Sequence, residues 1–188
     1  ISPQCPGVIQ ANVGAARVQG FEIEAAYAPT DYLSFNGSIA HADAEITDPG
    51  PGVADSIGQP LEKGDALTGV PEWTANFGAQ LSFDVPRLAP GSFGYVRADW
   101  RFVDERINGF GDKESLRATI PFNVADSYQM TDVRMGVETD VWTGQVYVSN
   151  VFDERAVFET MRDFAQVNIQ EAAIAQPRTV GFKLSRRF

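Results

Sequence analysis

Charged side chains recur at every second position in several stretches of this chain. They are Glu22, Glu24, Arg97, Asp99, Arg101, Asp132, Arg134 and Glu138. A spacing of two places successive charges on the same face of a β-strand, where carboxylates and guanidinium groups can form ion pairs. Charges enclosed by protein need such partners. We therefore expect these residues to pair with one another or with an apposed domain; direct contact with a passing ligand is the alternative.

Four acidic residues could instead support metal chemistry. Asp43, Glu45, Asp48 and Asp55 are close in the sequence and carry the oxygen ligands that divalent cations prefer. Their spacing matches no ordered ligand set, so a solvated acidic loop is expected and no metal site is predicted.

The only histidine, His41, is the one residue that a Ser/His hydrolase would have to use. It shares a strand face with Leu33, Phe35 and Ile39, and that face of the flanking segments offers no serine as nucleophile. The sequence therefore predicts a histidine at a membrane interface, with no enzyme activity and no cofactor.

Aromatic residues in the long connectors have two candidate roles. Phe110, Phe122, Phe158 and Phe164 either stack on a ligand or anchor the loops, and the sequence does not separate these roles. Cys5, the only cysteine, is expected to be a free thiol or to pair with a cysteine upstream.

Seven segments that alternate apolar and polar residues must position all of these groups. They run over about 18–28, 32–46, 73–84, 94–102, 132–138, 143–149 and 179–188. In the clearest segment, apolar side chains stand at every second position, namely Trp73, Ala75, Phe77, Ala79, Leu81 and Phe83. This period gives each strand one oily face and one wet face.

Composition limits the classes of protein that fit this pattern. Hydrophobic residues make up 44% of the chain, and no apolar run reaches the roughly 18 residues that a transmembrane helix needs. The net charge of -10 opposes binding to nucleic acid, whose phosphates would be repelled. The pattern predicts an all-β, antiparallel transmembrane β-barrel segment with lipid outside, water inside and the charged face lining the lumen.

Connector lengths predict the orientation of this segment. The connectors at about 29–31 and 140–142 are short and the one at about 85–92 is of intermediate length, whereas those at about 47–70, 106–126 and 158–176 are long. Outer-membrane barrels have short periplasmic turns and long extracellular loops. Seven strands cannot close a barrel, because an open edge in lipid leaves backbone groups unsatisfied.

The strand spacing also predicts how much is missing. At about 27 residues per strand (188 divided by 7), a barrel of roughly 22 strands needs about 590 residues. We therefore expect residues 1–188 to be the C-terminal portion, with further strands upstream.

Four segments resemble motifs of the TonB-dependent receptors, which are plugged outer-membrane transporters. They are NVGAARVQGFEIE at 12–24, GVPEWT at 69–74, VSNVFDER at 148–155 and PRTVGF at 177–182. Gly20 and Gly181 are expected where the chain comes into close contact, and Asn150 where strand pairing ends. Phe182, Leu184 and Phe188 resemble the C-terminal signal that the outer-membrane assembly machinery recognises, from which Arg186 departs.

The resemblance implies a receptor in the outer membrane of a Gram-negative bacterium. Such a receptor imports a scarce nutrient of the ferric siderophore, cobalamin or oligosaccharide class, and its plug domain and TonB-contacting segment would precede this chain. A general porin and, less favoured, a lipid-modifying barrel enzyme are the alternatives. The resemblance does not name the ligand.

Overall fold

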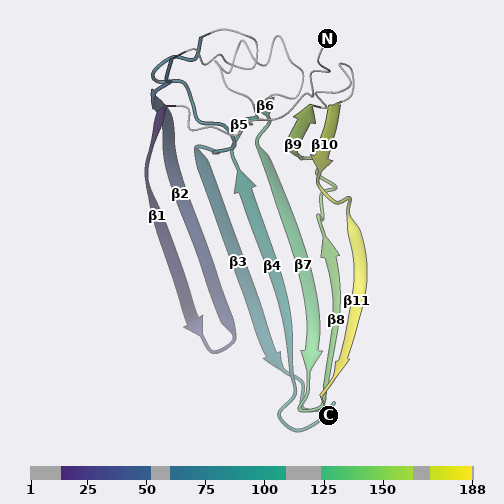
Figure 1. Ribbon diagram of the computed structural model, residues 1–188. Helices are drawn as coiled ribbons and strands as arrows, with labels where there is room; N and C mark the ends of the chain where they lie inside the picture. Colours follow the sequence, from purple (N-terminus) through teal and green to yellow (C-terminus); the bar gives the residue numbers. More distant parts are fainter. Residues whose placement is uncertain (1–13, 52–59, 109–123, 163–169, 188) are drawn as a thin grey trace.

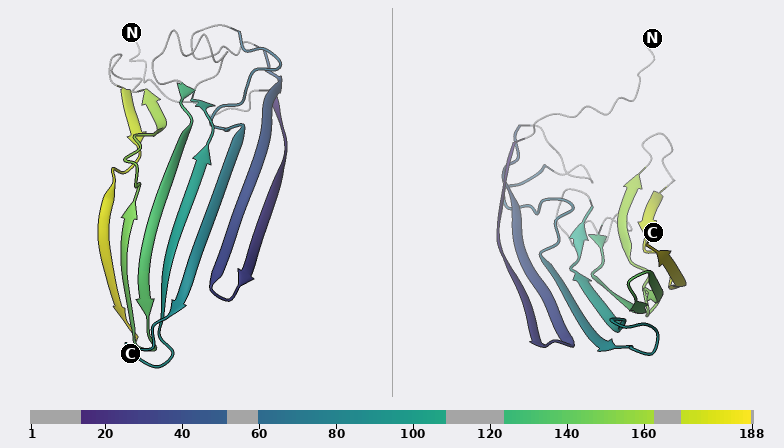
Figure 2. Two further views of the ribbon diagram at one scale, coloured as in Figure 1. Left: turned by 180° about the vertical axis from the view of Figure 1, so that it is seen from behind. Right: turned by 90° about the horizontal axis from the view of Figure 1, so that it is seen from below.

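One antiparallel sheet of seven long strands dominates the computed structural model, which describes residues 14–51, 60–108, 124–162 and 170–187. The strands lie side by side in the order β1-β2-β3-β4-β7-β8-β11 (Figure 1). Their bounds are β1 Ala15–Thr30, β2 Leu33–Asp48, β3 Trp73–Asp84, β4 Phe93–Val103, β7 Tyr128–Glu138, β8 Trp142–Ser149 and β11 Thr179–Arg186. Seen from below, the sheet is curved like a section of a barrel wall (Figure 2). The predicted all-β class and the seven wall strands are confirmed.

Short and long connections alternate between the two ends of the sheet, as predicted (Figure 1). Polar side chains close two of the short turns. The hydroxyl oxygen of Thr30 accepts a hydrogen bond from the backbone N–H of Leu33 at 3.1 Å. The hydroxyl oxygen of Thr139 accepts one from Trp142 N–H at 2.8 Å. Such local bonds favour tight turns because they satisfy backbone groups that strand pairing leaves free.

Four short strands lie in the long connectors predicted at about 106–126 and 158–176, at one end of the sheet (Figure 1). β5 (Arg106–Ile107) pairs with β6 (Val124–Ala125), and β9 (Val157–Arg162) pairs with β10 (Gln170–Ile174). Ile107 and Val124 form a small buried cluster there. Strands this short carry no readable alternation, so tertiary contacts rather than local pattern place them.

The strand register places the apolar residues of all seven strands on one continuous face. Leu81, Val96 and Met135 are successive partners across β3, β4 and β7. Val146 on β8 and Phe182 on β11 continue the same row. Because directly opposed residues of antiparallel strands project from the same side of the sheet, the oily faces predicted strand by strand merge into one surface.

No protein layer covers this apolar face in the part of the chain that the structure describes. Phe77, Leu81 and Met135 lie on interior strands, yet their exposed fractions are 49%, 51% and 52%. An apolar surface of this extent is unfavourable in water, because the hydrophobic effect favours removing apolar area from water. It suits the hydrocarbon of a bilayer.

Aromatic residues mark the upper edge of the apolar face, towards the long connections. Phe21, His41 and Trp73 are neighbours across β1, β2 and β3. The His41 ring stacks on Phe21 at 5.7 Å between centroids and meets the Trp73 ring edge-on at 4.5 Å. The next pair outward on this face is Gln19 and Asp43, so the surface becomes polar directly above the cluster.

The lower edge carries a similar boundary, and the band between the edges matches a bilayer core. Arg186 lies over the Trp142 ring with its guanidinium carbon 5.3 Å from the centroid. The rise from Trp73 to Phe83 along β3 is about 33 Å, which a strand tilt of about 40° reduces to a height of about 25 Å. Among the described residues, no helix is long and apolar enough to span a membrane, a finding that does not bear on strands.

Candidate functional site

The polar face of the sheet carries the charged residues predicted from the sequence and brings Arg97, Asp99 and Arg134 into contact. Asp99 on β4 lies directly opposite Asp132 on β7, and in the adjacent row Arg97 lies opposite Arg134. Like charges placed opposite one another repel. The arrangement is therefore stable only if each arginine reaches a carboxylate in the neighbouring row.

The side chains form these contacts around Asp99. Arg97 donates from Nη2 and Nε to Asp99 Oδ1, at 2.6 and 2.9 Å. Arg134 Nη2 lies 3.4 Å from Asp99 Oδ2. Arg97 Nη2 also donates to Asn36 Oδ1 at 2.9 Å. One carboxylate thus joins two arginines, and we call Asn36, Arg97, Asp99 and Arg134 the Asp99 cluster.

Gly78 provides the space that the Asp99 cluster occupies. It is buried, and a Cβ atom added there would lie 2.6 Å from both Arg97 Nη2 and Asn36 Oδ1. A larger residue would push these groups off the sheet surface. The hydrogen bonds of the cluster therefore depend on a glycine two strands away from Arg134.

We expect Gly78→Ala to destabilise the folded barrel by about 1–2 kcal/mol, because the added methyl group displaces hydrogen-bonded polar groups. Gly144→Ala is the matched control, since the nearest atom to an added Cβ there is Leu184 Cδ1 at 4.0 Å. Alanine at that site should be neutral or stabilise by about 0.5 kcal/mol, as the unfolded chain loses freedom. Urea unfolding of the refolded full-length protein measures both, and equal effects would contradict the role assigned to Gly78.

The remaining charges on the polar face have fewer partners within the wall. Asp132 Oδ1 accepts a hydrogen bond from the backbone N–H of Asn150 at 2.8 Å. Arg101 Nη2 contacts the Met130 sulfur at 3.4 Å, and Arg187 Nη2 lies 3.9 Å from Glu138 Oε1. Within the described residues, no side chain binds Glu22 or Glu24.

Several residues of the polar face were not singled out from the sequence. Tyr95 donates its hydroxyl to Gln145 Oε1 at 2.8 Å, and its ring covers Gly136. The Tyr147 ring covers Gly181, where an added Cβ would lie 2.5 Å from Cζ. Each tyrosine faces its glycine directly across the strand pair. An aromatic residue opposite a glycine is a signal that reveals such pairs once the register is known.

The close contacts predicted for two glycines are confirmed. Gly181 lies beneath the Tyr147 ring, and a Cβ on Gly20 would lie 2.0 Å from the backbone oxygen of His41. Glycine is required at Gly20 because no side chain fits between these backbones.

The four acidic residues near the upper edge do not gather in the described part of the chain. Glu45 forms an ion pair with Arg17, and Asp48 Oδ1 accepts a hydrogen bond from Gly50 N–H at 3.0 Å. No group of three or more potential metal-binding side chains occurs among the described residues. Asp55 lies outside them.

His41 has one polar side-chain partner among the described residues. Its Nε2 lies 3.4 Å from Glu72 Oε1, and its ring lies between Phe21 and Trp73. No serine hydroxyl of the described chain contacts the ring. These contacts are those of a histidine in an aromatic belt.

Of the four aromatic residues in the long connectors, the structure describes Phe158 alone. Its ring lies 5.3 Å from that of Tyr128, and its backbone oxygen accepts a hydrogen bond from Arg106. Phe158 therefore anchors the β9–β10 hairpin to the wall. Phe110, Phe122 and Phe164 lie outside the described residues, as do Cys5 and Phe188.

Asn150 joins two motifs that are far apart in the sequence. It is 1% exposed, has a positive φ of 52°, and donates from Nδ2 to the backbone oxygens of Glu154 and Gln176, both at 2.9 Å. Its Oδ1 accepts from Glu154 N–H at 2.8 Å. Nearby, Asp153 Oδ1 accepts from Arg178 N–H at 2.9 Å. The prediction that Asn150 ends strand pairing by binding backbone groups is confirmed.

Solved structures share this fold. The ferric yersiniabactin uptake receptor FyuA of Yersinia pestis is 20% identical, with a TM-score of 0.69 over 94% of this chain and 24% of that chain. The siderophore receptor PiuA of Acinetobacter baumannii is 19% identical, with a TM-score of 0.63 over 92% of this chain and 22% of that chain. The ferric-catecholate import receptor Fiu of E. coli K12 is 22% identical, with a TM-score of 0.63 over 90% of this chain and 20% of that chain. The chain spans about a quarter of the length of these relatives, and at such identities the similarity shows the fold.

A comparison with curated proteins gives no match. A comparison with protein-family models, however, gives a match to the sequence. Residues 2–151, most of the chain, match the TonB dependent receptor-like β-barrel family. The sheet agrees with this match, because one face suits lipid and the other carries the Asp99 cluster. The chain belongs to the TonB-dependent receptor β-barrel family.

Proposed function

We propose that this chain is the C-terminal wall of an outer-membrane receptor that imports a scarce nutrient in a Gram-negative bacterium. The family membership and the sheet with one oily and one charged face support the proposal. The three solved relatives are named as receptors for ferric yersiniabactin, a siderophore and a ferric catecholate, so ferric siderophores are the first class to test, ahead of cobalamin and oligosaccharides. In this role the chain contributes wall, loops and the terminal strand, and it performs no catalysis.

We further propose that the polar face docks a plug domain encoded upstream. The Asp99 cluster pairs one carboxylate with two arginines and so keeps a net charge of about +1, whereas Glu22 and Glu24 have no partner within the described wall. Carboxylates enclosed between wall and plug require cations, because an unpaired charge away from water is costly. Glu22 and Glu24 are therefore the wall positions that a basic plug residue would pair with, and Arg101 is the position for an acidic one.

Two further partners follow from the same proposal. The TonB complex would act through the upstream plug segment. The assembly machinery would recognise the last strand, where Phe182 and Leu184 project onto the apolar face and where Phe188 follows.

The uptake of labelled ferric siderophores by cells with and without the intact full-length gene tests this function. We expect energy-dependent uptake that disappears when the gene or the TonB complex is disrupted. Passive flux of small solutes that needs no TonB complex would instead identify a porin. Panels of cobalamin and oligosaccharides, used in the same cells, distinguish the ligand classes.

Two variants sharpen the uptake experiment. His41→Ala should leave uptake intact, since the ring lies in the aromatic belt; loss of a lipid-modifying activity in that variant would support an enzyme. The double variant Glu22→Gln/Glu24→Gln should reduce uptake several-fold while the protein remains folded in the membrane. Unchanged uptake would contradict the docking role of these carboxylates.

A further inference from the structure

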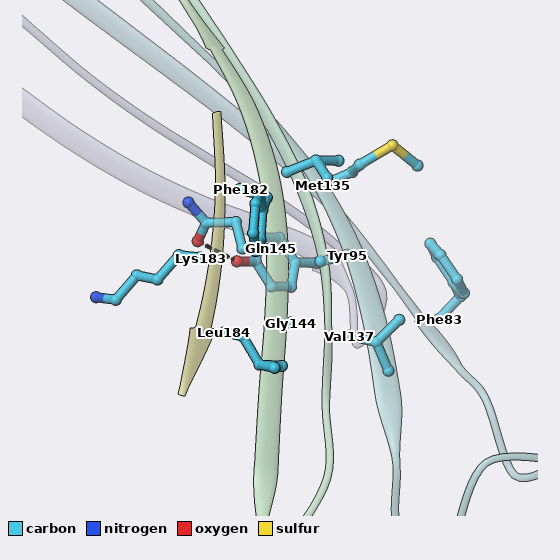
Figure 3. A pocket seen from close by; sticks show the side chains of 11 residues that line it. Phe83, Tyr95, Met135, Val137, Gly144, Gln145, Phe182, Lys183 and Leu184 are labelled. Carbon is cyan, nitrogen blue, oxygen red and sulfur yellow. Dashed lines mark hydrogen bonds between the residues drawn. The ribbon is translucent and has the colours of Figure 1, made fainter. Parts of the chain in front are cut away.

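An apolar groove crosses the lipid-facing surface near the short-turn end of the sheet. Its apolar lining comes from β3, β7, β8 and β11. Its volume is about 410 Å³, within the range of roughly 300–1,000 Å³ found for ligand pockets. The side chains that line it on the apolar face are Phe83, Met135, Val137, Val146, Phe182 and Leu184. In Figure 3, Met135, Val137 and Phe83 lie on one side of the strands, whereas the Lys183 ammonium points to the other side.

The groove exists because one glycine in its floor is uncovered. Phe83, Gly94, Val137, Gly144 and Leu184 form one row across the sheet. The Phe83 ring fills the space at Gly94, where an added Cβ would lie 2.4 Å from Phe83 Cε2. At Gly144 the only atom near an added Cβ is Leu184 Cδ1 at 4.0 Å. The depression at Gly144 is thus left open between Val137 and Leu184.

A positive charge lies on the same face just beyond the lower end of this groove. Arg186 follows Leu184 by two positions on β11, so both side chains project from the same face, about 7 Å apart along the strand. The guanidinium group lies over Trp142, the partner of Arg186 on β8. Arginine and tryptophan at this depth are typical of the boundary between hydrocarbon and lipid headgroups.

A second apolar groove on the same face provides an internal comparison. It has a volume of about 320 Å³ and contains Gly37, with Ile23, Phe35 and Phe77 among its lining residues. None of its lining residues is charged. The Gly144 groove differs from it in having Arg186 on the same face, two positions beyond its lining residue Leu184 on β11.

We infer that the Gly144 groove binds one anionic glycerophospholipid, with an acyl chain over Gly144 and the phosphate at Arg186. The inference rests on the proposed placement of this wall in a bilayer. An acyl chain fills the groove with apolar contacts that mobile lipid would make less completely. The guanidinium fork binds phosphate oxygens in a bidentate manner, and its attraction to the lipid increases with the net negative charge of the headgroup.

Native mass spectrometry of the full-length receptor in detergent micelles tests this site, with phosphatidylglycerol and phosphatidylethanolamine as the probes. The unmodified protein should retain one phosphatidylglycerol in preference to phosphatidylethanolamine. Gly144→Leu fills the groove and should weaken retention of both lipids about tenfold, because the acyl chain loses its buried contacts. Ala98→Leu, which places the same side chain on the apolar face outside the groove, should leave retention unchanged.

Arg186→Gln tests the headgroup contact separately, and its position at the exposed end of a strand makes it compatible with folding. It should abolish the preference for phosphatidylglycerol while weak retention of both lipids persists. Equal retention by the Gly144→Leu and Ala98→Leu variants would overturn the site, as would a preference that survives Arg186→Gln. Lipid retention is measured without any nutrient, so its outcome is separate from that of the uptake experiment.

Discussion

Replacing Ala98 by arginine should destabilise the folded barrel by about 2–4 kcal/mol, the cost measured for a basic residue at the midplane of an outer-membrane barrel. Ala98 is exposed on the apolar face of β4 and lies between Ala79 and Val133, near the middle of the apolar band. No carboxylate on that face is within reach, so the new charge must be buried in hydrocarbon or bend towards an interface. Urea titration of the full-length protein refolded into lipid vesicles gives the free energy of unfolding.

Ser38→Arg is the matched control for this experiment. Ser38 lies at a similar depth on the polar face and is directly opposite Glu24. An arginine there is directly opposite a carboxylate on the polar face, so the free energy of unfolding should change by less than about 1 kcal/mol. If the two variants had equal effects, or if Ser38→Arg were the more damaging one, the assignment of lipid and lumen to the two faces would be reversed or wrong.

Asn150→Ala should cost about 4 kcal/mol, which makes it the most damaging single truncation that we expect in the polar part of the wall. The substitution leaves the carbonyl groups of Glu154 and Gln176 and the N–H of Glu154 without their partner in a partly buried position. It also forces alanine into a left-handed backbone conformation, which costs about 1 kcal/mol. The same urea titration measures the loss, and amide hydrogen exchange at Glu154 and Ala175 should accelerate because the β9–β10 hairpin loses its attachment.

Two variants separate the contributions at Asn150. Asn150→Gly accepts the positive φ and should cost about 1 kcal/mol less than Asn150→Ala. Asn76→Ala removes the same amide group where it makes a single 3.3 Å bond to Ser38 in an exposed position, so it should cost about 0.5 kcal/mol. A similar cost for Asn150→Ala and Asn76→Ala would show that the buried hydrogen bonds of Asn150 do not hold the two motifs together.

The sequence by itself determined the strand class, the two faces and the orientation of the connections. A period of two is a property of the extended backbone, so Leu81 and Gln80 must project to opposite sides whatever their partners are. Proline, glycine and threonine near the short turns likewise act locally. For the same reason Gly20, Gly181 and Asn150 could be selected from the sequence as special positions.

Only the tertiary structure decided which side chains meet. Alternation shows that Arg97, Asp99 and Arg134 share a face. The register and the open space at Gly78 decide that Asp99 contacts both arginines. Glu22 and Glu24 have no partner in the described wall. The β9–β10 hairpin and the groove at Gly144 also depend on partners distant in the sequence. Contacts of this kind are formed by residues that pairing brings together, and a local pattern contains no information about the partner strand.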